Sequence, residues 1–325
     1  MWINWVIFIG ITASFQISHF ILRRYKVGMK IIRISGYLSY LCFIDVIGVL
    51  FGLHGYMLIY ISSEIRLGFY LFALFTFLRY PLYTFFQALF QLAGDFYIKR
   101  LKHIRMPTKN TYTQKTEYIL PFKGKWTVRG GGMDKRLRHR GSVSQTYAYD
   151  FVIMDGYGKS CQGNSTDLHN YFCYAKDIIA TADGIVVQVR KNAKDSLVDG
   201  VKAYCGSSDI RGNYITIKHN DGEYSVSAHL MPGSIVVEAG DKVKQGMVIA
   251  KCGNSGNSSE PHLHFQFQSG KSFFFSAGLP LAFKGITAQN KTNYKMADRR
   301  STENNLQIAG DKVYIGRGLE VYNEI

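Results

Sequence analysis

The chain has 325 residues, a formal net charge of +16 and 47% hydrophobic residues. This length suggests about two domains of typical size and allows a sizeable core. The basic excess favours a polyanionic neighbour, such as an acidic cell-wall or lipid surface, although a basic surface without any partner is an equally good interpretation. Nucleic acid is not expected as a partner, because the sequence has no module of interleaved aromatic and basic residues.

Residues 1–98 are rich in Phe, Leu, Ile and Tyr and poor in charge. Trp2–Leu22 has the length of one bilayer crossing, and Gly36–Ile61 is a second apolar span. Leu67–Leu92 is a third apolar stretch, which either crosses the bilayer or lies in the interface with Arg79 reaching toward water. The N-terminus lacks the basic region and the small-residue cleavage site of a signal peptide. We therefore expect a transmembrane region with two or three helical spans, which anchors the chain in a lipid bilayer.

Charged residues inside apolar spans are costly and normally face a partner or a cavity. Asp45 and Arg79 lie well inside the second and third stretches, and a short connection, 62–66, joins the two stretches. We expect an ion pair between Asp45 and Arg79. If these charges are themselves functional, the membrane half would instead be the working part of a sensor or of a transporter-associated subunit.

The orientation in the membrane follows from the basic residues. Five Lys and Arg residues between Arg23 and Arg33 should be cytoplasmic. Two spans then place the C-terminal domain outside, and three spans place it inside, which the basic run from Lys99 to Arg105 also favours. The chemistry argued below favours a membrane protein whose C-terminal domain lies on the extracytoplasmic side.

The second half of the chain is polar, basic and rich in Gly. Residues 99–124 are interpreted as a basic polar linker, residues 125–286 as a folded domain, and residues 287–325 as a polar C-terminal tail with a last strand. Short β-type runs alternate with Gly, Asn and Asp turns, which predicts an all-β domain after the α-helical membrane region. The expected strands are Lys125–Val128, Tyr147–Ile153, Gly184–Arg190, Asn213–His219, Glu223–His229, Met247–Lys251, His262–Gln268 and, in the tail, Lys312–Val321.

Four of the five cysteines follow the membrane half: Cys161, Cys173, Cys205 and Cys252. An even number in an exported domain allows disulfides, and we expect the pairs Cys161–Cys173 and Cys205–Cys252 among three possible connectivities. The chain has no Cys-x-x-Cys motif, so a thiolate zinc site is not expected.

A histidine pair stands out in residues 253–265, where a Gly, Asn and Ser turn leads into a short aromatic strand. Alternate side chains of a strand share a face, so His262 and His264 point the same way while Leu263 and Phe265 point into a core. Two imidazoles on one face favour a metal site with an adjacent base. A half-exposed strand that carries two histidines without a metal is the plain alternative.

Other residues can complete such a site. A catalytic zinc needs about three protein ligands and an open position for water. Asp150 is an acid among aromatic residues, which is costly unless the acid is paired or bound to a cation. His229 ends one expected strand, and His139 lies in a basic loop upstream of Asp150.

Several short motifs occur in an order that resembles the lysostaphin-type zinc metallopeptidases, the LytM-domain peptidoglycan endopeptidases. The resemblance covers about residues 125–268, less than half of the chain. The motifs are His139, Asp150, Ala182-Asp-Gly-Ile-Val, Gly212-Asn-Tyr-Ile-Thr-Ile, Ala228-His-Leu, Gly240-Asp-Lys-Val-Lys-Gln-Gly, Gly253-Asn-Ser-Gly and Pro261-His-Leu-His-Phe.

The resemblance implies an antiparallel β-sheet groove with one Zn²⁺ per domain on its floor. It implies that His139, Asp150 and His264 are the zinc ligands. It also implies that His229 and His262 are a catalytic pair that orients and deprotonates the water and stabilises the oxyanion.

The first motif departs from the common family pattern. His139 and Asp150 are eleven residues apart, whereas the common spacing is four. A subset of the family with a Gln-x-Tyr-Ala-x-Asp-Phe strand is similar to this longer version. His169 and His103 are alternatives to His139, and Asp183 is an alternative to Asp150, while His219 is interpreted as structural.

The resulting prediction is a membrane-anchored zinc metalloendopeptidase that hydrolyses amide bonds in peptidoglycan peptides by means of a zinc-activated water. The alternative is a non-catalytic LytM-type binding module that regulates another cell-wall hydrolase. Such modules usually lack a metal ligand or a base, and here all five positions are filled.

Overall fold

The computed structural model of the chain describes residues 82–101, 105–133, 143–196, 198, 209–298 and 305–324. The chain divides into two compact units, Met1–Phe85 and Phe86–Ile325, of which the second is described here. Several predictions fall outside the described residues: the zinc ligand His139, its alternative His103, the Asp45–Arg79 pair, Cys205, the first two membrane spans and residues 67–81 of the third.

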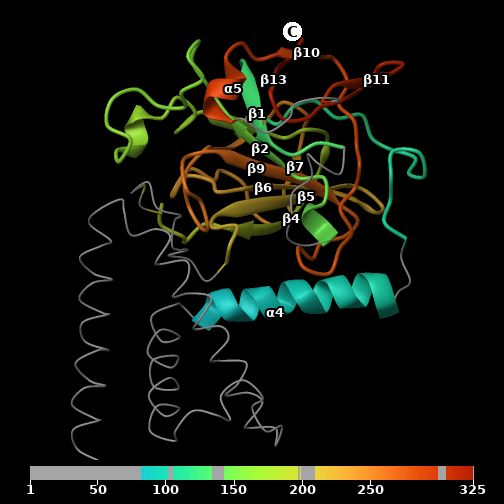
Figure 1. Ribbon diagram of the computed structural model, residues 1–325. Coiled ribbons are helices and arrows are strands. Elements are labelled where there is room, and N and C mark those ends of the chain that lie inside the picture. The colour runs from blue at the N-terminus through green and yellow to red at the C-terminus, as the bar shows by residue number, and fades with distance from the viewer. Residues whose placement is uncertain are drawn as a thin grey trace, which may run out of the picture. The chain divides into compact units, whose positions relative to one another are not determined.

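The second unit is built on one large antiparallel sheet, which confirms the all-β prediction. Its order is β10-β13-β1-β2-β9-β6-β5-β4-β7, and Figure 1 shows β2, β9, β6, β5 and β4 following one another across it. The nine strands are β1 (Trp126–Gly130), β2 (Tyr149–Val152), β4 (Gly184–Arg190), β5 (Tyr214–Asn220), β6 (Glu223–Ala228), β7 (Lys242–Val243), β9 (Leu263–Gln268), β10 (Ile286–Asn290) and β13 (Leu319–Asn323).

Smaller elements surround this sheet. Two strand pairs are separate from it: β3 (Asp177–Ile179) with β8 (Val248–Lys251), and β11 (Gln307–Ala309) with β12 (Lys312–Tyr314). The described helices are α4 (Leu82–Phe96), which continues as a π-helix over Tyr97–Leu101, the short α5 (Tyr294–Ala297), and 3₁₀ turns at Val143–Gln145 and Leu168–Asn170.

The central strand β9 shows why this sequence forms a sheet with two buried faces. Leu263, Phe265 and Phe267 alternate with polar residues and join the main hydrophobic core. Every residue of β9 is buried, so the polar residues of the other face are also shielded from water. Buried polar groups need hydrogen-bond partners, and this requirement organises the site described below.

The core begins earlier in the chain than predicted. Tyr118, Leu120 and Phe122 are fully buried, and the Phe122 ring stacks on Trp126 with a centroid separation of 4.7 Å. The predicted linker 99–124 therefore ends too late. Residues 99–124 are polar overall, but near their end every second residue is apolar and packs in the core.

The predicted tail also belongs to the domain. Within 287–325, β13 lies between β10 and β1, so two of these three neighbouring strands follow residue 285. The expected strand Lys312–Val321 is two strands, β12 and β13, because the chain turns at Gly318, where φ is 91°. This segment was interpreted as a tail because many of its side chains are polar. Strands near the edge of a sheet can expose one face to water and therefore carry polar residues.

Helix α4 packs on the loop that follows β9. The backbone of Gly94 lies against Phe274, whose carbonyl oxygen leaves no room for a Cβ at this position. Asp95 accepts a hydrogen bond from the backbone N–H of Val143 at 2.8 Å. In the part of the chain that the structure describes, no helix combines the length and apolarity needed to cross a membrane.

The cysteines differ from the expected pairing. Cys161, Cys173 and Cys252 are free thiols, so neither the Cys161–Cys173 nor the Cys205–Cys252 disulfide is present. Cys173 and Cys252 are both buried, and Cys173 Sγ donates to the Pro261 carbonyl at 3.0 Å. Burial, followed by the neighbouring Cys173 thiol, raises the pKa of Cys252 well above its usual value.

Asn213 ties three segments together just before β5. It is fully buried; its Oδ1 accepts from the Ala193 N–H at 2.8 Å, and its Nδ2 donates to the carbonyls of Ala193 at 2.7 Å and Leu230 at 3.1 Å. Its own N–H donates to Ser255 Oγ at 2.9 Å. The side chain therefore fixes the segment that follows β6 against the loop after β4, and the backbone N–H of Asn213 adds a contact to the loop before β9.

We expect Asn213→Ala to destabilise the domain by about 3 kcal/mol, because a buried donor or acceptor left without a partner costs roughly 1–3 kcal/mol. Urea unfolding of the purified full chain measures this. The exposed Asn192 provides the matched control, and Asn192→Ala should change stability by less than about 0.5 kcal/mol. A loss below about 1 kcal/mol for Asn213→Ala would contradict the bracing role.

His219 is structural, as predicted from its place beside a turn. Its Nδ1 lies 2.8 Å from the Asp183 carbonyl and its Nε2 lies 2.7 Å from Ser225 Oγ. The ring also meets Tyr118 edge-on, with a centroid separation of 5.2 Å. Loss of hydration lowers the pKa of His219, although the Asp183 carbonyl partly opposes this shift.

A depressed histidine pKa means that the unfolded chain binds this proton more tightly than the folded chain. Stability from His219 is therefore full above its unfolded pKa of about 6.5 and falls as the pH drops from there toward the folded pKa. We expect the free energy of unfolding of His219→Gln to depend less on pH between about pH 5 and pH 7 than that of the unmodified protein. An unchanged slope for His219→Gln would refute the assignment.

Candidate active site

The candidate site lies where three neighbouring strands meet: β2, β9 and β6. In the β2–β9 pair Asp150 lies opposite His264, and in the β6–β9 pair Ala228 lies opposite the same His264. Directly opposed residues of antiparallel strands share a face. The register therefore brings Asp150, His264 and the end of β6 into one row across the sheet.

Both histidines of the pair reach the same carboxylate. His264 Nδ1 lies 3.0 Å from Asp150 Oδ1, and His262 Nε2 lies 3.7 Å from it. The structure thus confirms that His262 and His264 point to the same side. Their side chains are 14% and 7% exposed and that of Asp150 is 21% exposed, so the cluster is shielded but reachable from solvent.

The tautomer of His262 follows from its partners. Its Nδ1 lies 2.8 Å from the Glu260 carbonyl and 3.0 Å from Ser258 Oγ, and that hydroxyl itself donates to the same carbonyl. A carbonyl only accepts hydrogen bonds, so Nδ1 carries the proton and Nε2 presents a lone pair toward Asp150.

His229 completes the cluster from the end of β6. Its ring centroid lies 4.6 Å from that of His262 and 5.8 Å from that of His264. The residue has a left-handed φ of 60°, which is uncommon for a side chain other than Gly. Hydrogen bonds hold it there: its N–H donates to the Arg211 carbonyl at 2.9 Å, and its carbonyl accepts from Gly253 N–H at 3.1 Å.

The protonation of His229 is also fixed by the fold. Its Nδ1 lies 2.7 Å from the Ser255 carbonyl, so this nitrogen is the donor and Nε2 keeps its lone pair. Burial, followed by the nearby rings of His262 and His264, lowers the pKa of His229 well below its usual value. His229 is therefore a neutral imidazole at physiological pH.

Gln266 is a site residue that the sequence analysis missed. It is fully buried on the polar face of β9, and its Oε1 lies 3.1 Å from His264 Nε2. Its amide nitrogen donates to Gln268 Oε1 at 2.7 Å, and Gln268 donates in turn to the Gly270 carbonyl at 2.7 Å. The alternation His264-Phe-Gln266-Phe-Gln268 is the signal that could have identified this chain of polar side chains.

The donor set fits a bound cation. The Gln266 oxygen accepts the proton on Nε2 of His264, so the unprotonated Nδ1 of this ring faces Asp150 Oδ1. The unprotonated Nε2 of His262 faces the same oxygen. An imidazole lone pair directed at a carboxylate is unfavourable unless a proton or a cation lies between them. A carboxylate oxygen with imidazole nitrogens is a common ligand set for zinc.

The described residues do not form a complete metal site. Within them, no group of three or more His, Cys, Asp or Glu side chains is arranged to hold a metal ion. Asp150 and His264 are described and lie together, whereas the third predicted ligand, His139, is outside the described residues. The ligand set therefore stays a prediction.

The alternative ligands are engaged elsewhere. Asp183 is exposed at the β4–β7 end of the sheet, where it pairs with Lys244 at 2.7 Å and accepts from Gln245 N–H at 2.8 Å. His169 is exposed on a 3₁₀ turn, and its ring meets Tyr174 edge-on with a centroid separation of 5.2 Å.

A comparison with known protein families gives a match for part of the chain. Residues 170–274 match Peptidase family M23. The matched region contains His229, His262 and His264 and begins after Asp150. The match thus covers the histidine-bearing strands and the loop before β9.

Two curated relatives share parts of this chain. A protein of Buchnera aphidicola named as an uncharacterized metalloprotease is 44% identical over 71 residues, which are 22% of this chain and 18% of that protein. The peptidoglycan DD-endopeptidase ShyB of Vibrio cholerae is 28% identical over 187 residues, which are 54% of this chain and 38% of ShyB. The chain therefore spans less than half the length of these relatives.

Two solved structures are also similar. The catalytic domain of lysostaphin from Staphylococcus simulans is 22% identical, with a TM-score of 0.26 over 54% of this chain and 95% of that domain. A zinc-containing peptidase from Vibrio cholerae is 22% identical, with a TM-score of 0.31 over 51% of this chain and 39% of that structure. The sequence match therefore places a Peptidase M23 domain at residues 170–274, about a third of the chain.

Proposed function

We propose that the chain is a membrane-anchored zinc metalloendopeptidase that hydrolyses amide bonds in peptidoglycan peptides. The observation that carries this proposal is the convergence of one carboxylate and three imidazoles, from Asp150, His229, His262 and His264, at one row of the sheet. The similarity to ShyB, a peptidoglycan DD-endopeptidase, supports the substrate class.

Asp150 and His264, together with His139, would hold the zinc. When bound, the zinc would acidify a water molecule and polarise the scissile carbonyl. Gln266 accepts the Nε2 proton of His264 in this scheme and keeps Nδ1 available on the Asp150 side. The buried chain through Gln268 fixes the orientation of Gln266.

His262 is the best placed general base. The Glu260 carbonyl holds the proton on Nδ1, so the opposite nitrogen, Nε2, can take a proton from the attacking water and return it to the leaving amine. The Ser255 carbonyl holds His229 in the same tautomer. A neutral His229 with Nε2 as an acceptor orients the water, and stabilises an oxyanion only after it gains a proton.

Measuring zinc in the purified full chain, alongside release of new amines from isolated peptidoglycan, tests the proposal. We expect stoichiometric zinc together with amine release. Zinc without amine release would favour a different peptide substrate. A chain without zinc would favour the alternative, a non-catalytic module that regulates another cell-wall hydrolase.

Substitution of the two neighbouring histidines should separate metal binding from catalysis. We expect His264→Ala to lose both zinc and activity, because it removes a ligand. We expect His262→Ala to keep zinc and to lose about 10²–10⁴-fold in kcat, which is the usual contribution of a general base. Zinc content and amine release measure both effects.

His169→Ala is the matched control for these substitutions, because His169 is exposed and packs on Tyr174. This variant should retain both zinc and activity. Undiminished turnover in His262→Ala would overturn the assignment of the base.

We also propose that residues 1–98 anchor the chain in the cell membrane and that the peptidase domain lies on the extracytoplasmic side. The apolar lengths of Trp2–Leu22 and Gly36–Ile61 support the anchor. The substrate supports the side, because peptidoglycan lies outside the membrane. With the basic loop at Arg23–Arg33 in the cytoplasm, two spans give this orientation.

In cells, we expect the full chain to remain in the membrane fraction after an alkaline carbonate wash. Protease added to spheroplasts should remove the peptidase domain while a cytoplasmic marker protein stays intact. Recovery of the chain in the soluble fraction would contradict the anchor. Protection of the domain in intact spheroplasts, with digestion after lysis, would contradict the orientation.

A further inference from the structure

Two cysteines are fully buried among the residues that the structure describes. Cys173 and Cys252 have exposed fractions of 0% and 1%, and both belong to the main hydrophobic core. That core also contains Phe265 and Phe267, so it packs on the face of β9 opposite to His264. The proposed hydrolysis therefore uses neither thiol.

Backbone hydrogen bonds hold the two cysteines beside each other. Cys173 begins a turn, in which the Lys176 N–H donates to the Cys173 carbonyl at 3.2 Å. The Lys176 carbonyl then accepts the Cys252 N–H at 2.8 Å, and the Ala175 N–H donates to the Cys252 carbonyl at 2.8 Å. The backbone of Cys252 is thus fixed against the turn, and β3 with β8 continues the same antiparallel pairing.

The side chains of the two residues also approach each other inside the core. The Cys173 thiol is the strongest influence on the pKa of Cys252 after burial, and both raise it. The contact and the backbone pairing agree on one arrangement, in which two thiols face each other in an apolar environment.

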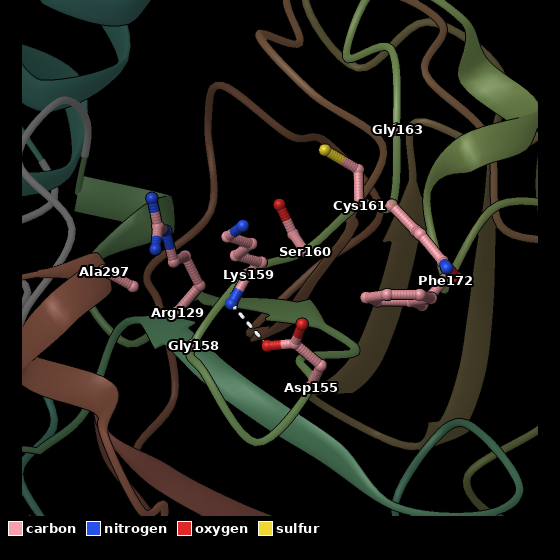
Figure 2. Close-up of a pocket in the computed structure, with 10 residues that line it drawn as sticks. Arg129, Asp155, Gly158, Lys159, Ser160, Cys161, Gly163, Phe172 and Ala297 are labelled. Carbon is pink, nitrogen blue, oxygen red and sulfur yellow. Dashed lines mark hydrogen bonds between the residues drawn. The ribbon is translucent and has the colours of Figure 1, made fainter.

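Cys161 is placed differently. It is half-buried, and its backbone bridges Tyr171. It lines a surface cavity of about 750 Å³, and in Figure 2 its sulfur points away from Phe172, the residue before Cys173. These contacts favour Cys252 over Cys161 as the partner of Cys173.

We propose that Cys173 and Cys252 form a disulfide when the chain folds in an oxidising compartment. The extracytoplasmic side, where we place the domain, is such a compartment. The inference concerns a modification site and does not depend on endopeptidase activity.

The oxidant is an external disulfide, either of a thiol oxidoreductase or of glutathione. One cysteine thiolate attacks this disulfide, which gives a mixed disulfide and releases one thiol. The second cysteine thiolate attacks the protein sulfur of the mixed disulfide and releases the other thiol. The two cysteines thus lose two protons and two electrons, and the oxidant becomes two thiols. The bond forms while the thiols are still accessible, and burial then shields it from reducing thiols.

The disulfide would brace the segment that carries the proposed catalytic pair. Cys252 directly precedes Gly253, whose N–H donates to the His229 carbonyl at 3.1 Å. Cys173 Sγ donates to the carbonyl of Pro261, the residue before His262. The bond would also close residues 173–252 into a loop in the unfolded chain, which favours the folded state. Oxidation removes the donor to Pro261, so part of this stabilisation is offset.

The test uses the full chain, purified in detergent and reduced. The chain is unfolded and refolded in a mixture of glutathione and glutathione disulfide, then denatured, alkylated and digested. Mass spectrometry of the peptides should find Cys173 linked to Cys252, with a mass lower by two hydrogen atoms than that of the two free peptides. Cys161 should be alkylated.

Thermal unfolding measures the effect of the bond. The oxidised chain should unfold about 5–15 °C above the same chain kept in reductant. Cys173→Ala and Cys252→Ala should each abolish this difference, and the double variant should behave like either one. Each variant is compared with itself in the two buffers, so a loss of packing does not enter the result. Cys161→Ala is the matched control and should keep the full difference.

Alkylation of both Cys173 and Cys252 after oxidative refolding would overturn the proposal. A link from either residue to another cysteine would overturn it as well, as would a redox-dependent difference that survives in Cys252→Ala. Absent amine release from peptidoglycan would count against the proposed function alone, because peptide mapping reads the cysteines directly.

Discussion

The pairing of Asp150 with His264 across β2 and β9 is the constraint on which the rest of the site depends. A slip of one residue would turn every side chain of β9 to the opposite face, because side chains alternate along a strand. Leu263, Phe265 and Phe267 prevent this slip, since they would lose their place in the core. The same hydrophobic packing that stabilises the sheet therefore also aligns the carboxylate with the imidazoles.

Several strands of the large sheet were the most predictable part of the chain. Gly184–Arg190 matches β4 at both ends, and the strand after His262 extends to Gln268 as expected. These runs have a clear alternation bounded by turn residues, and local pattern decides their structure. The side-by-side placement of His262 and His264 also followed from the alternation of side chains along a strand. Their contact with Asp150 did not, because it depends on the pairing of two strands more than 100 residues apart in the sequence.

The missed features share a physical cause. Gln266 and Glu260 were overlooked because their roles come from contacts and not from residue type. The side chain of Gln266 orients His264, and the backbone carbonyl of Glu260 holds His262 Nδ1. The boundaries of linker and tail were misplaced because composition does not report burial of short segments such as Tyr118 to Phe122. The cysteines were paired by their number, but three-dimensional contact places Cys173 under the Pro261 carbonyl.

The position of β13 has a consequence for the order in which the protein can assemble. Trp126 at the start of β1 pairs with Val321, a separation of 195 residues. Closing so long a loop is entropically unfavourable until other contacts compensate, and contacts of this range slow folding. During synthesis β1 stays without this neighbour until Leu319–Asn323 has left the ribosome, so β1 presents an open edge while the residues between the two strands are made. A chain that crosses a membrane while still extended would avoid that exposure, because its sheet would close only after transport is complete.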